Sequence, residues 1–349
     1  MPKDHTNLDV QEKIKKALRE LVRLVDPTSG QPNSDPLWVL ARDIGIMRLN
    51  QKNYGYELAR ALGSSAMSSV PASPPEQVLG WRASTQSDIE SDWAAYWCNE
   101  LGIRPVYHRK VWELAYVLHN LWLHGAIAPG KKGLGFGCGQ EPLPSYLAAK
   151  GLEIVATDLA PNHADAKAWR NTNQHTEDLD KIWQPHLVDR EQFDQHVSLA
   201  YVDMNAIPSS LSDFDFCWSI CALEHLGSIK KGLDFIRNSL NAIRPGGIAV
   251  HTTEFNFSPG STIDNWPVVL FQQEHFESIA NLLRQDGNQV DPISFDTGRG
   301  VLDRFIDLPP YGDDMPGYMK SNEEFPSHLK LSIDGIAATC FGIVIRKTS

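Results

Sequence analysis

Glycine recurs at every second position from 133 to 139 in the stretch Gly133-Leu134-Gly135-Phe136-Gly137-Cys138-Gly139-Gln140-Glu141-Pro142. This stretch lies between a short apolar run, Lys132 to Phe136, and a segment of helical composition, Pro142 to Lys150. Glycines at such a junction let the backbone turn sharply and approach a ligand closely. The amide dipoles of the following helix point back at the same place. The stretch therefore predicts a ligand-binding loop between a strand and a helix.

The spacing of these glycines disfavours one common class of ligand-binding loop. A nicotinamide-binding loop needs the pattern G-x-G-x-x-G. Counting from Gly133 puts Cys138 at the last position, and counting from Gly135 puts Gln140 there. Neither register fits, which disfavours an oxidoreductase of that type.

Strand and helix patterns alternate on either side of the loop. Alternation of this kind predicts an α/β fold with a doubly wound, mainly parallel sheet. We predict further strands at Leu152 to Thr157, Leu199 to Val202, Phe214 to Ile220, Gly247 to Thr253, Gln289 to Phe295 and Ala337 to Arg346, and helices at Ser228 to Ile243 and Ser278 to Asp286.

Two carboxylates end predicted strands beside the loop. Asp158 follows Gly139 by 19 positions, and neighbouring parallel strands would bring it to the loop, where it can accept hydrogen bonds from two ribose hydroxyls. Capping of the next helix is the structural alternative. Asp203 and Met204 end a later strand in the same way.

Two more elements follow in order. The first is Phe214-Asp215-Phe216-Cys217-Trp218-Ser219-Ile220-Cys221-Ala222-Leu223-Glu224-His225-Leu226, and the second is Arg244-Pro245-Gly246-Gly247. Together with the glycine loop and the strand-end carboxylates, this set resembles class I S-adenosylmethionine-dependent methyltransferases. The resemblance implies a seven-stranded Rossmann-like sheet and cofactor-binding roles for Gly135, Phe136, Gly137, Gly139, Glu141, Asp158, Leu159, Asp203, Met204, Ser219 and Ile220.

This chain departs from the family pattern at two positions, and it also resembles one subgroup of the family. A typical member carries an acidic residue where this chain has Gly135, and a further glycine near Glu141, which is our candidate for a displaced carboxylate. The run Tyr107-His108-Arg109-Lys110-Val111-Trp112-Glu113, followed by the glycine loop, resembles a bacterial subgroup associated with surface-glycan biosynthesis. That likeness suggests a glycan or small-molecule acceptor, with O-methylation of a sugar.

Methyl transfer to a hydroxyl needs alignment and removal of a proton. Histidine is the default base near neutral pH. We rank His225 first, with Glu224 beside it, against an equally weighted structural role. His251 in the fifth strand is a substrate candidate. So are Arg304, Tyr311 and His328, in the long segment 254–330 that is expected to cover the substrate; an ordinary surface loop is the alternative.

Composition narrows the partners. The 349 residues are 42% hydrophobic with a formal net charge of -11, which disfavours nucleic acid. We expect no membrane span, and scattered cysteines with a charged N-terminus favour a reduced, cytoplasmic setting. Asp203, Asp264 and Asn265 could offer oxygen ligands, but without a compact acidic signature we expect no metal. Oligomeric state is not specified.

Domain boundaries follow composition. We predict an N-terminal helical segment at 1–63, including helices at Leu8 to Val25 and Asn53 to Leu62, and a Ser/Pro-rich linker at 64–78. An aromatic-rich helical cap at 79–128 would precede the S-adenosylmethionine-binding domain at 129–349. The cap's aromatic rings are expected to pack it onto that domain, or else to line a pocket. A non-catalytic cofactor-binding or scaffold protein is the alternative function.

Overall fold

The structure is a computed structural model that describes residues 13–16, 28–30, 34–66, 70–163, 176–265, 267–311 and 326–348. A mixed sheet of ten strands forms its centre, with the order β10-β1-β12-β6-β5-β2-β3-β4 and with β9 and β11 also paired to β12. These ten strands are β1 (Trp81–Ala83), β2 (Lys132–Phe136), β3 (Glu153–Asp158), β4 (Val197–Tyr201), β5 (Phe214–Ile220), β6 (Ile243–Asn256), β9 (Gln289–Val290), β10 (Ile293–Ser294), β11 (Lys330–Ile333) and β12 (Ile336–Arg346). The short β7 (Asp264–Asn265) and β8 (Val268–Val269) form a separate hairpin.

The predicted parallel sheet is confirmed in its central part. Strands β4, β3, β2, β5 and β6 are parallel neighbours, and β12 adds an antiparallel strand to β6. The chain order reverses between β2 and β5, so the carboxyl ends of β2 and β5 flank a crevice where ligands bind in folds of this kind.

The seven-strand count was wrong. The extra strands come from three short segments, of which β1 lies in the region predicted as a helical cap and β11 begins at the last residue of the predicted insertion. The single strand predicted at Gln289 to Phe295 is split into β9 and β10, because Pro292 between them has no N–H for a ladder hydrogen bond. The Pro292 carbonyl instead accepts a hydrogen bond from the Trp81 N–H.

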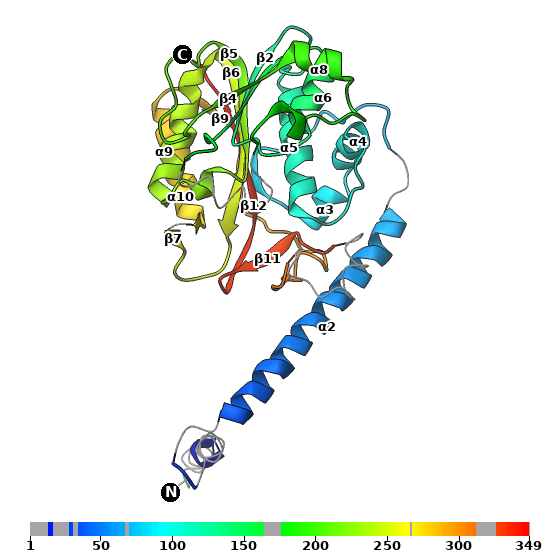
Figure 1. The fold of residues 1–349 in the computed structure, drawn as a ribbon, viewed down its shortest axis with the longest axis vertical. Coiled ribbons are helices and arrows are strands. Elements are labelled where there is room, and N and C mark those ends of the chain that lie inside the picture. Colours follow the sequence, from blue (N-terminus) through cyan, green and yellow to red (C-terminus); the bar gives the residue numbers. More distant parts are fainter. Residues whose placement is uncertain are drawn as a thin grey trace, which may run out of the picture. The chain divides into compact units, whose positions relative to one another are not determined.

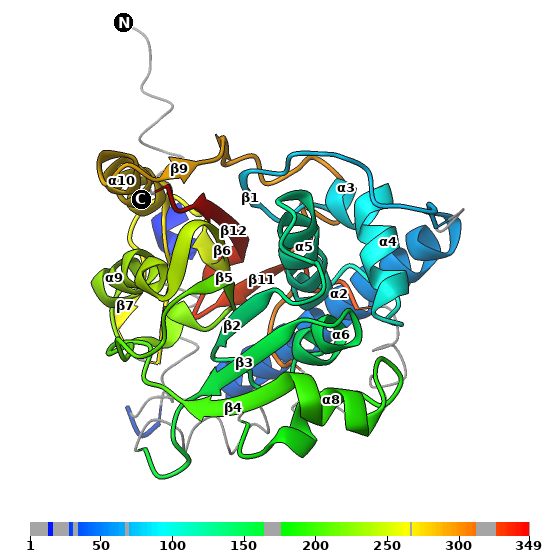
Figure 2. The same ribbon diagram turned by 90° about the horizontal axis from the view of Figure 1, so that it is seen from above.

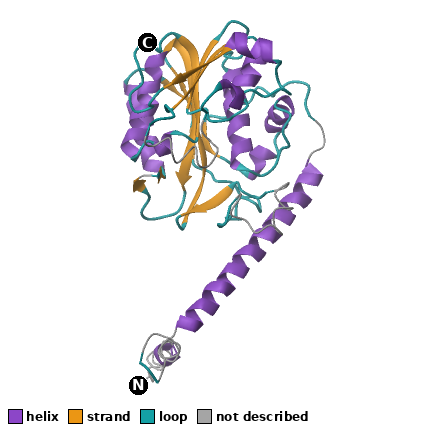
Figure 3. Cartoon of the chain, viewed as in Figure 1, coloured by secondary structure: helices purple, strands orange, loops and turns teal. Residues whose placement is uncertain are grey.

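Helices cover both faces of the sheet (Figures 1, 2 and 3). One layer holds α9 and α10, and the other holds α5 and α6 with α3, α4 and α8 around them. The bounds are α3 (Gln86–Ile89), α4 (Asp92–Glu100), α5 (Arg109–Leu123), α6 (Leu143–Ala149), α8 (Arg190–His196), α9 (Ile229–Ser239) and α10 (Gln273–Gln285). Three short 3-10 turns are η1 (Leu179–Lys181), η2 (Leu223–His225) and η3 (Leu240–Ala242).

The segment predicted as a cap is therefore part of the main fold, since it supplies both β1 and α5. Its aromatic side chains do pack, as expected: Trp93, Trp97 and Trp112 are almost fully buried. The Trp97 ring contacts Tyr146 of α6 edge-on, with 6.2 Å between ring centroids. The Trp97 ring also contacts Trp122 of α5 edge-on, with 6.5 Å between centroids, so aromatic contacts join α4 to both α5 and α6.

The N-terminal region is described in pieces. Of the helix predicted at Leu8 to Val25, residues 13–16 are helical and the rest lies outside the described residues. The helix predicted at Asn53 to Leu62 falls within the longer α2 (Ser34–Ala66). The chain divides into two compact units, Met1–Tyr54 and Gly55–Ser349. Among the described helices, none is long and apolar enough to span a membrane.

Candidate active site

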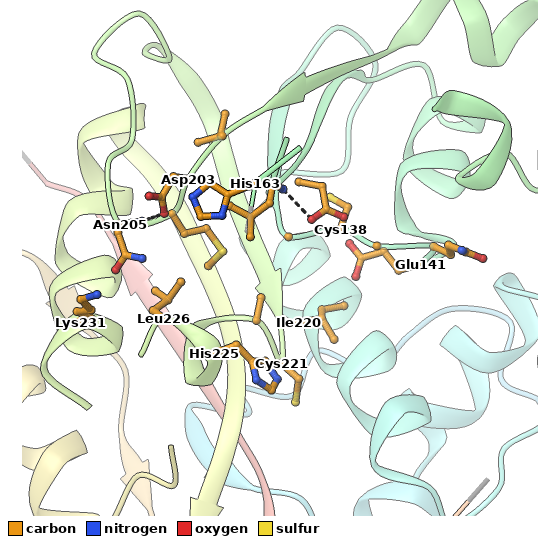
Figure 4. Close-up of a pocket in the computed structure, with 18 of the residues that line it drawn as sticks. Cys138, Glu141, His163, Asp203, Asn205, Ile220, Cys221, His225, Leu226 and Lys231 are labelled. Atoms are coloured by element: carbon orange, nitrogen blue, oxygen red, sulfur yellow. Dashed lines mark hydrogen bonds between the residues drawn. The ribbon is translucent and has the colours of Figure 1, made fainter. Parts of the chain in front are cut away.

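A cavity of about 580 Å³ opens at the carboxyl ends of β2, β3, β4 and β5 (Figure 4). Cavities of this size hold small molecules and cofactors. Its walls combine the glycine loop, three strand ends, η2 and one side of α5. The lining residues are Lys110, Leu114, Gly137, Cys138, Gly139, Gln140, Glu141, Pro142, Asp158, Leu159, His163, Val202, Asp203, Met204, Asn205, Ile220, Cys221, Ala222, His225, Leu226, Gly227 and Lys231.

The glycine loop forms one wall through its second half. Gly137 and Gly139 adopt left-handed backbone angles, with φ of 60° and 53°, which glycine accepts without steric cost. A Cβ on Gly137 would lie 2.9 Å from the Ala222 Cβ, which is closer than carbon atoms pack. The loop can therefore pass this close to η2 only because Gly137 has no side chain.

The first half of the loop supports the wall from behind. Gly135 and Phe136 belong to β2 and are buried, and neither lines the cavity. A Cβ on Gly135 would lie 2.3 Å from the Cys138 Sγ and 2.5 Å from the Trp218 ring. No side chain fits there, which explains in physical terms why the acidic residue typical of the resembling family is missing.

Glu141 points into the cavity two positions after the loop. One carboxylate oxygen accepts a hydrogen bond from the Trp218 indole N–H. Burial raises the pKa of this carboxyl to about 8, against the lowering effect of the Trp218 hydrogen bond. A cationic group bound beside Glu141 would reverse that shift and favour the carboxylate.

The two strand-end carboxylates both line the cavity. Parallel pairing sets Asp158 opposite Tyr201, so Asp158 and Asp203 end neighbouring strands at the same edge. Asp158 accepts hydrogen bonds from the Leu159 N–H at 2.8 Å and the Thr176 N–H at 3.0 Å. Asp203 accepts one from the Asn205 N–H, and Met204 beside it is buried against the cavity.

His225 lies in η2 with its ring lining the cavity, and Figure 4 shows it near Cys221 at one end. Its Nδ1 lies 2.8 Å from the Pro267 carbonyl oxygen, a contact that requires a proton on Nδ1. Burial lowers the pKa of His225 to about 4, so the imidazole is neutral at physiological pH. Glu224 beside it is buried; its Oε1 lies 3.8 Å from the His225 Nε2, and its Oε2 accepts a hydrogen bond from the Thr253 hydroxyl.

The side chains of Ser219 and Ile220, at the end of β5, point to different sides of the strand. Ile220 lines the cavity, whereas Ser219 points into the core and pairs with His251 at 2.8 Å. His251 also contacts the Ser239 hydroxyl at 3.1 Å and is fully buried. Burial lowers the pKa of His251 to about 3. The structure places this substrate candidate in the core as a hydrogen-bonded structural residue.

The candidates from the segment 254–330 also lie outside the cavity lining. Arg304 is exposed. Tyr311 donates a hydrogen bond to the Ser332 carbonyl, and His328 pairs with Asp307 at 2.7 Å while stacking on His108. Residues 312–325 of this segment, with Gly312, lie outside the described residues. Asp264, named as a possible oxygen ligand, accepts a hydrogen bond from the Ile229 N–H at the start of α9.

Sequence reasoning missed one wall of the cavity. Lys110 and Leu114 reach the cavity from α5, which precedes the glycine loop in the sequence. His163 and Asn205 come from loops, and Lys231 comes from α9. The run that contains Lys110 was noticed as a family likeness, but its position beside the cavity follows from tertiary packing alone.

A family model described as a methyltransferase domain matches residues 107–291. The chain belongs to this methyltransferase family. The matched range begins at Tyr107 and so includes α5 with the strands that form the cavity. No curated protein matches the methyltransferase.

Solved structures that match this chain are distant from it in sequence. An S-adenosylmethionine-dependent methyltransferase from Mesorhizobium loti has 12% identity and a TM-score of 0.37, and the match covers 65% of this chain and 95% of that one. Phosphoethanolamine N-methyltransferase 2 of Haemonchus contortus, in complex with S-adenosyl-L-methionine, has 16% identity and a TM-score of 0.37, with coverage of 67% and 52%.

Family membership confirms the predicted enzyme class, an S-adenosylmethionine-dependent methyltransferase. The cavity is compatible with that cofactor in size and in chemistry. It offers close-approach glycines, a buried carboxylate at Glu141 and strand-end carboxylates at Asp158 and Asp203, next to an apolar surface at Met204 and Ile220.

Proposed function

We propose that this methyltransferase transfers the methyl group of S-adenosylmethionine to a hydroxyl of a sugar or a similar small molecule, by in-line displacement. The observation that supports the proposal most strongly is the cavity itself, which gathers the glycine loop, Asp158, Asp203 and His225 from four separate parts of the chain. The cofactor supplies an activated methyl group on sulfur, so alignment and proton removal are what remains for the protein.

The cofactor's polar groups find partners around the cavity. We assign Gly137 and Gly139 to close backbone approach along its methionine part, and Glu141 to its ammonium group, opposite charges being favourable in a buried site. We assign Asp158, with Leu159 beside it, to the ribose hydroxyls. Asp203 would accept from the adenine amino group while Met204 and Ile220 pack on the ring.

The acceptor would meet His225. A neutral imidazole with its proton on Nδ1 presents the Nε2 lone pair, which can accept a hydrogen bond from a hydroxyl and take its proton as the methyl group moves. Glu224, buried behind His225, would limit the ways in which the ring can turn. Gly135, Phe136 and Ser219 support the site from the core without touching a ligand.

A glycan acceptor is the specific form of the proposal. It is supported by the likeness of residues 107–113 and the glycine loop to a subgroup associated with surface-glycan biosynthesis, and by the net charge of -11, which disfavours nucleic acid. The five cysteines are free thiols in the structure. We therefore place the reaction in a reducing, cytoplasmic compartment.

Mass spectrometry of candidate acceptors incubated with isotope-labelled S-adenosylmethionine tests the proposal. A labelled methyl ether on a sugar is the expected product, and label on nitrogen or carbon would contradict the assigned chemistry. His225→Ala should lower turnover while cofactor affinity stays nearly constant, and His196→Ala on α8, outside the cavity, serves as the matched control. Cofactor binding without turnover across a broad acceptor panel would favour the non-catalytic alternative.

A further inference from the structure

A second group of reactive side chains lies beside the cavity, and of its members the scheme above uses only Glu224. Glu113 from α5, Cys221 at the end of β5, Glu224 from η2, Glu254 from β6 and Cys340 from β12 gather there, and we call them the Glu–Cys cluster. Each of the three glutamates and Cys340 is at most 2% exposed. Cys221 is the member that lines the cavity.

Two sets of atoms in the cluster lie within ligand range of one another. The first set is one carboxylate oxygen of Glu113 with the thiols of Cys221 and Cys340, and the second is Cys221 with one oxygen each from Glu224 and Glu254. Within each set all atoms are within 4.8 Å. Cys221 belongs to both sets, so the cluster has a common centre at its thiol.

One oxygen of each glutamate in the cluster has a partner outside the cluster. Oε2 of Glu113 accepts hydrogen bonds from the Thr252 hydroxyl at 3.1 Å and the Lys110 ammonium at 3.3 Å. Oε2 of Glu224 accepts from Thr253 at 3.1 Å, and Oε1 of Glu254 pairs with Arg109. The carboxylates are thus fixed in orientation from outside, as supporting residues fix the ligands of a metal ion.

The other oxygens of two glutamates lack a hydrogen bond within the described part of the chain. Glu224 Oε1 and Glu254 Oε2 are buried, and no described donor lies within hydrogen-bond distance of either; Glu224 Oε1 is 3.8 Å from the His225 Nε2. A buried carboxylate oxygen without a partner carries a large desolvation cost. One oxygen of each residue lies within 4.8 Å of the Cys221 thiol, so a cation bound at that thiol would offset part of this cost.

The two thiols have the separation that zinc requires. Cys221 Sγ and Cys340 Sγ lie 3.7 Å apart. Two thiolates bound to one tetrahedral zinc at about 2.3 Å each lie roughly 3.8 Å from one another. The Glu113 Oε1 atom lies 2.6 Å from the Cys340 thiol, so a modest shift would bring it into the same coordination sphere.

We propose that Glu113, Cys221 and Cys340 bind one zinc ion, whose fourth position faces the cavity beside Cys221. Two thiolates and one carboxylate suit zinc better than magnesium or calcium, which prefer oxygen ligands alone. Binding releases the two thiol protons, and one doubly charged ion replaces them, so the net charge of the buried cluster is unchanged. Three protein ligands with one open position are the arrangement of catalytic zinc sites.

This site departs from the expectation of no metal. Its ligands come from positions 113, 221 and 340, so no short spacing signals them. The sequence search for paired cysteines therefore had nothing to find. The proposal is independent of the acceptor's identity, because it concerns what the protein binds before any substrate.

Metal analysis of the full chain tests the site. The protein is produced in zinc-supplemented medium and purified with reductant and without chelator. Inductively coupled plasma mass spectrometry should then find about one zinc per chain. Cys340→Ser should lose this zinc, and Cys98→Ser, a buried cysteine on α4 outside the cluster, should keep it. Thr252→Val removes the hydroxyl that donates to Glu113 but keeps the shape of the side chain. It should weaken zinc binding by roughly 10- to 100-fold, because Glu113 would lose a hydrogen bond that orients it.

Cobalt substitution gives a second signature that does not depend on activity. The wild-type protein with cobalt should show a thiolate-to-metal absorption band, and Cys340→Ser should not. Wild-type protein that takes up no zinc after reconstitution, or a Cys340→Ser variant that keeps full occupancy, would overturn the proposal. A Cys221–Cys340 disulfide as the resting state in reductant would also overturn it, in favour of a redox pair. Calorimetry with S-adenosylmethionine on the same samples tests the cofactor assignment separately.

Discussion

Gly137→Ala tests the assignment of the glycine loop to close approach. In the wild-type protein this residue lines the cavity with φ of 60°, and a Cβ there would lie 2.9 Å from the Ala222 Cβ and 3.4 Å from the Met204 Sδ. Holding alanine in the left-handed region costs roughly 1–2 kcal/mol. Crowding against Ala222 adds about 1–3 kcal/mol, as is usual for an extra methyl group in a packed site.

Relief of that crowding would move the loop or η2 into the cavity. We expect S-adenosylmethionine affinity to fall by about 10- to 100-fold, equivalent to about 1.4–2.8 kcal/mol. Isothermal titration calorimetry measures this change, and chemical denaturation of the same sample measures the loss of stability. The two losses should appear together, because both arise from the same displaced backbone.

Gly130→Ala is the matched control. Gly130 has φ of 79°, nothing lies within 4 Å of its ideal Cβ position, and it does not line the cavity. The control should lose the backbone part of the stability, roughly 1–2 kcal/mol, and keep wild-type affinity. If Gly137→Ala bound the cofactor as tightly as Gly130→Ala, the proposed close approach at Gly137 would be refuted.

Three further predictions concern single charged groups. Asp158→Ala should weaken S-adenosylmethionine binding by about 10- to 150-fold, the loss of charge-assisted hydrogen bonds worth about 1.5–3 kcal/mol, and calorimetry with unchanged affinity would contradict the ribose assignment. Burial raises the pKa of Glu141 to about 8, so binding of a cationic group must displace the carboxyl proton. The affinity for S-adenosylmethionine should therefore rise from pH 6 to 7.5 by up to about tenfold per pH unit, as calorimetry would measure. Glu141→Gln should flatten this profile. Burial lowers the pKa of Lys330 to about 8, so between pH 8 and 10 the unfolded chain binds more protons at this residue than the folded chain does. The free energy of unfolding should therefore rise with pH over this range. Denaturation curves of Lys330→Met should show that rise reduced by up to about 1.4 kcal/mol per pH unit.

The central sheet was predictable because its strands carry a local signal. The bounds of β2 and β5 match the predicted ranges residue for residue, since each is a short apolar run buried on both faces. Strand β1 carries no such signal: three residues, Trp81–Ala83, cannot show a period, and their strand conformation depends on pairing with β12. Its place in the sheet could not be predicted from its own residues.

The site divides in the same way. Asp158 and Asp203 were predictable because parallel strands in a known order end at one edge. His251 was misleading as a substrate candidate because strand alternation alone does not say which face a residue takes; its ring turned inward to Ser219 and Ser239. The three ligands of the proposed zinc site come together through the packing of α5, β5 and β12, which no spacing along the chain records.

The pairing of β1 with β12 and β10 has a consequence for how the chain is made. Residues 81–83 pair with Ile293, Ser294, Phe341 and Gly342, so their partners leave the ribosome more than 200 residues later. Contacts between such distant residues slow folding. Until then the growing chain carries an incomplete sheet with an open edge at β6, the kind of surface on which nascent chains aggregate. Strand β12 therefore joins β1 and β10 to the rest of the sheet, and a chain that stops short of Phe341 would leave both of these strands without their connection to β6.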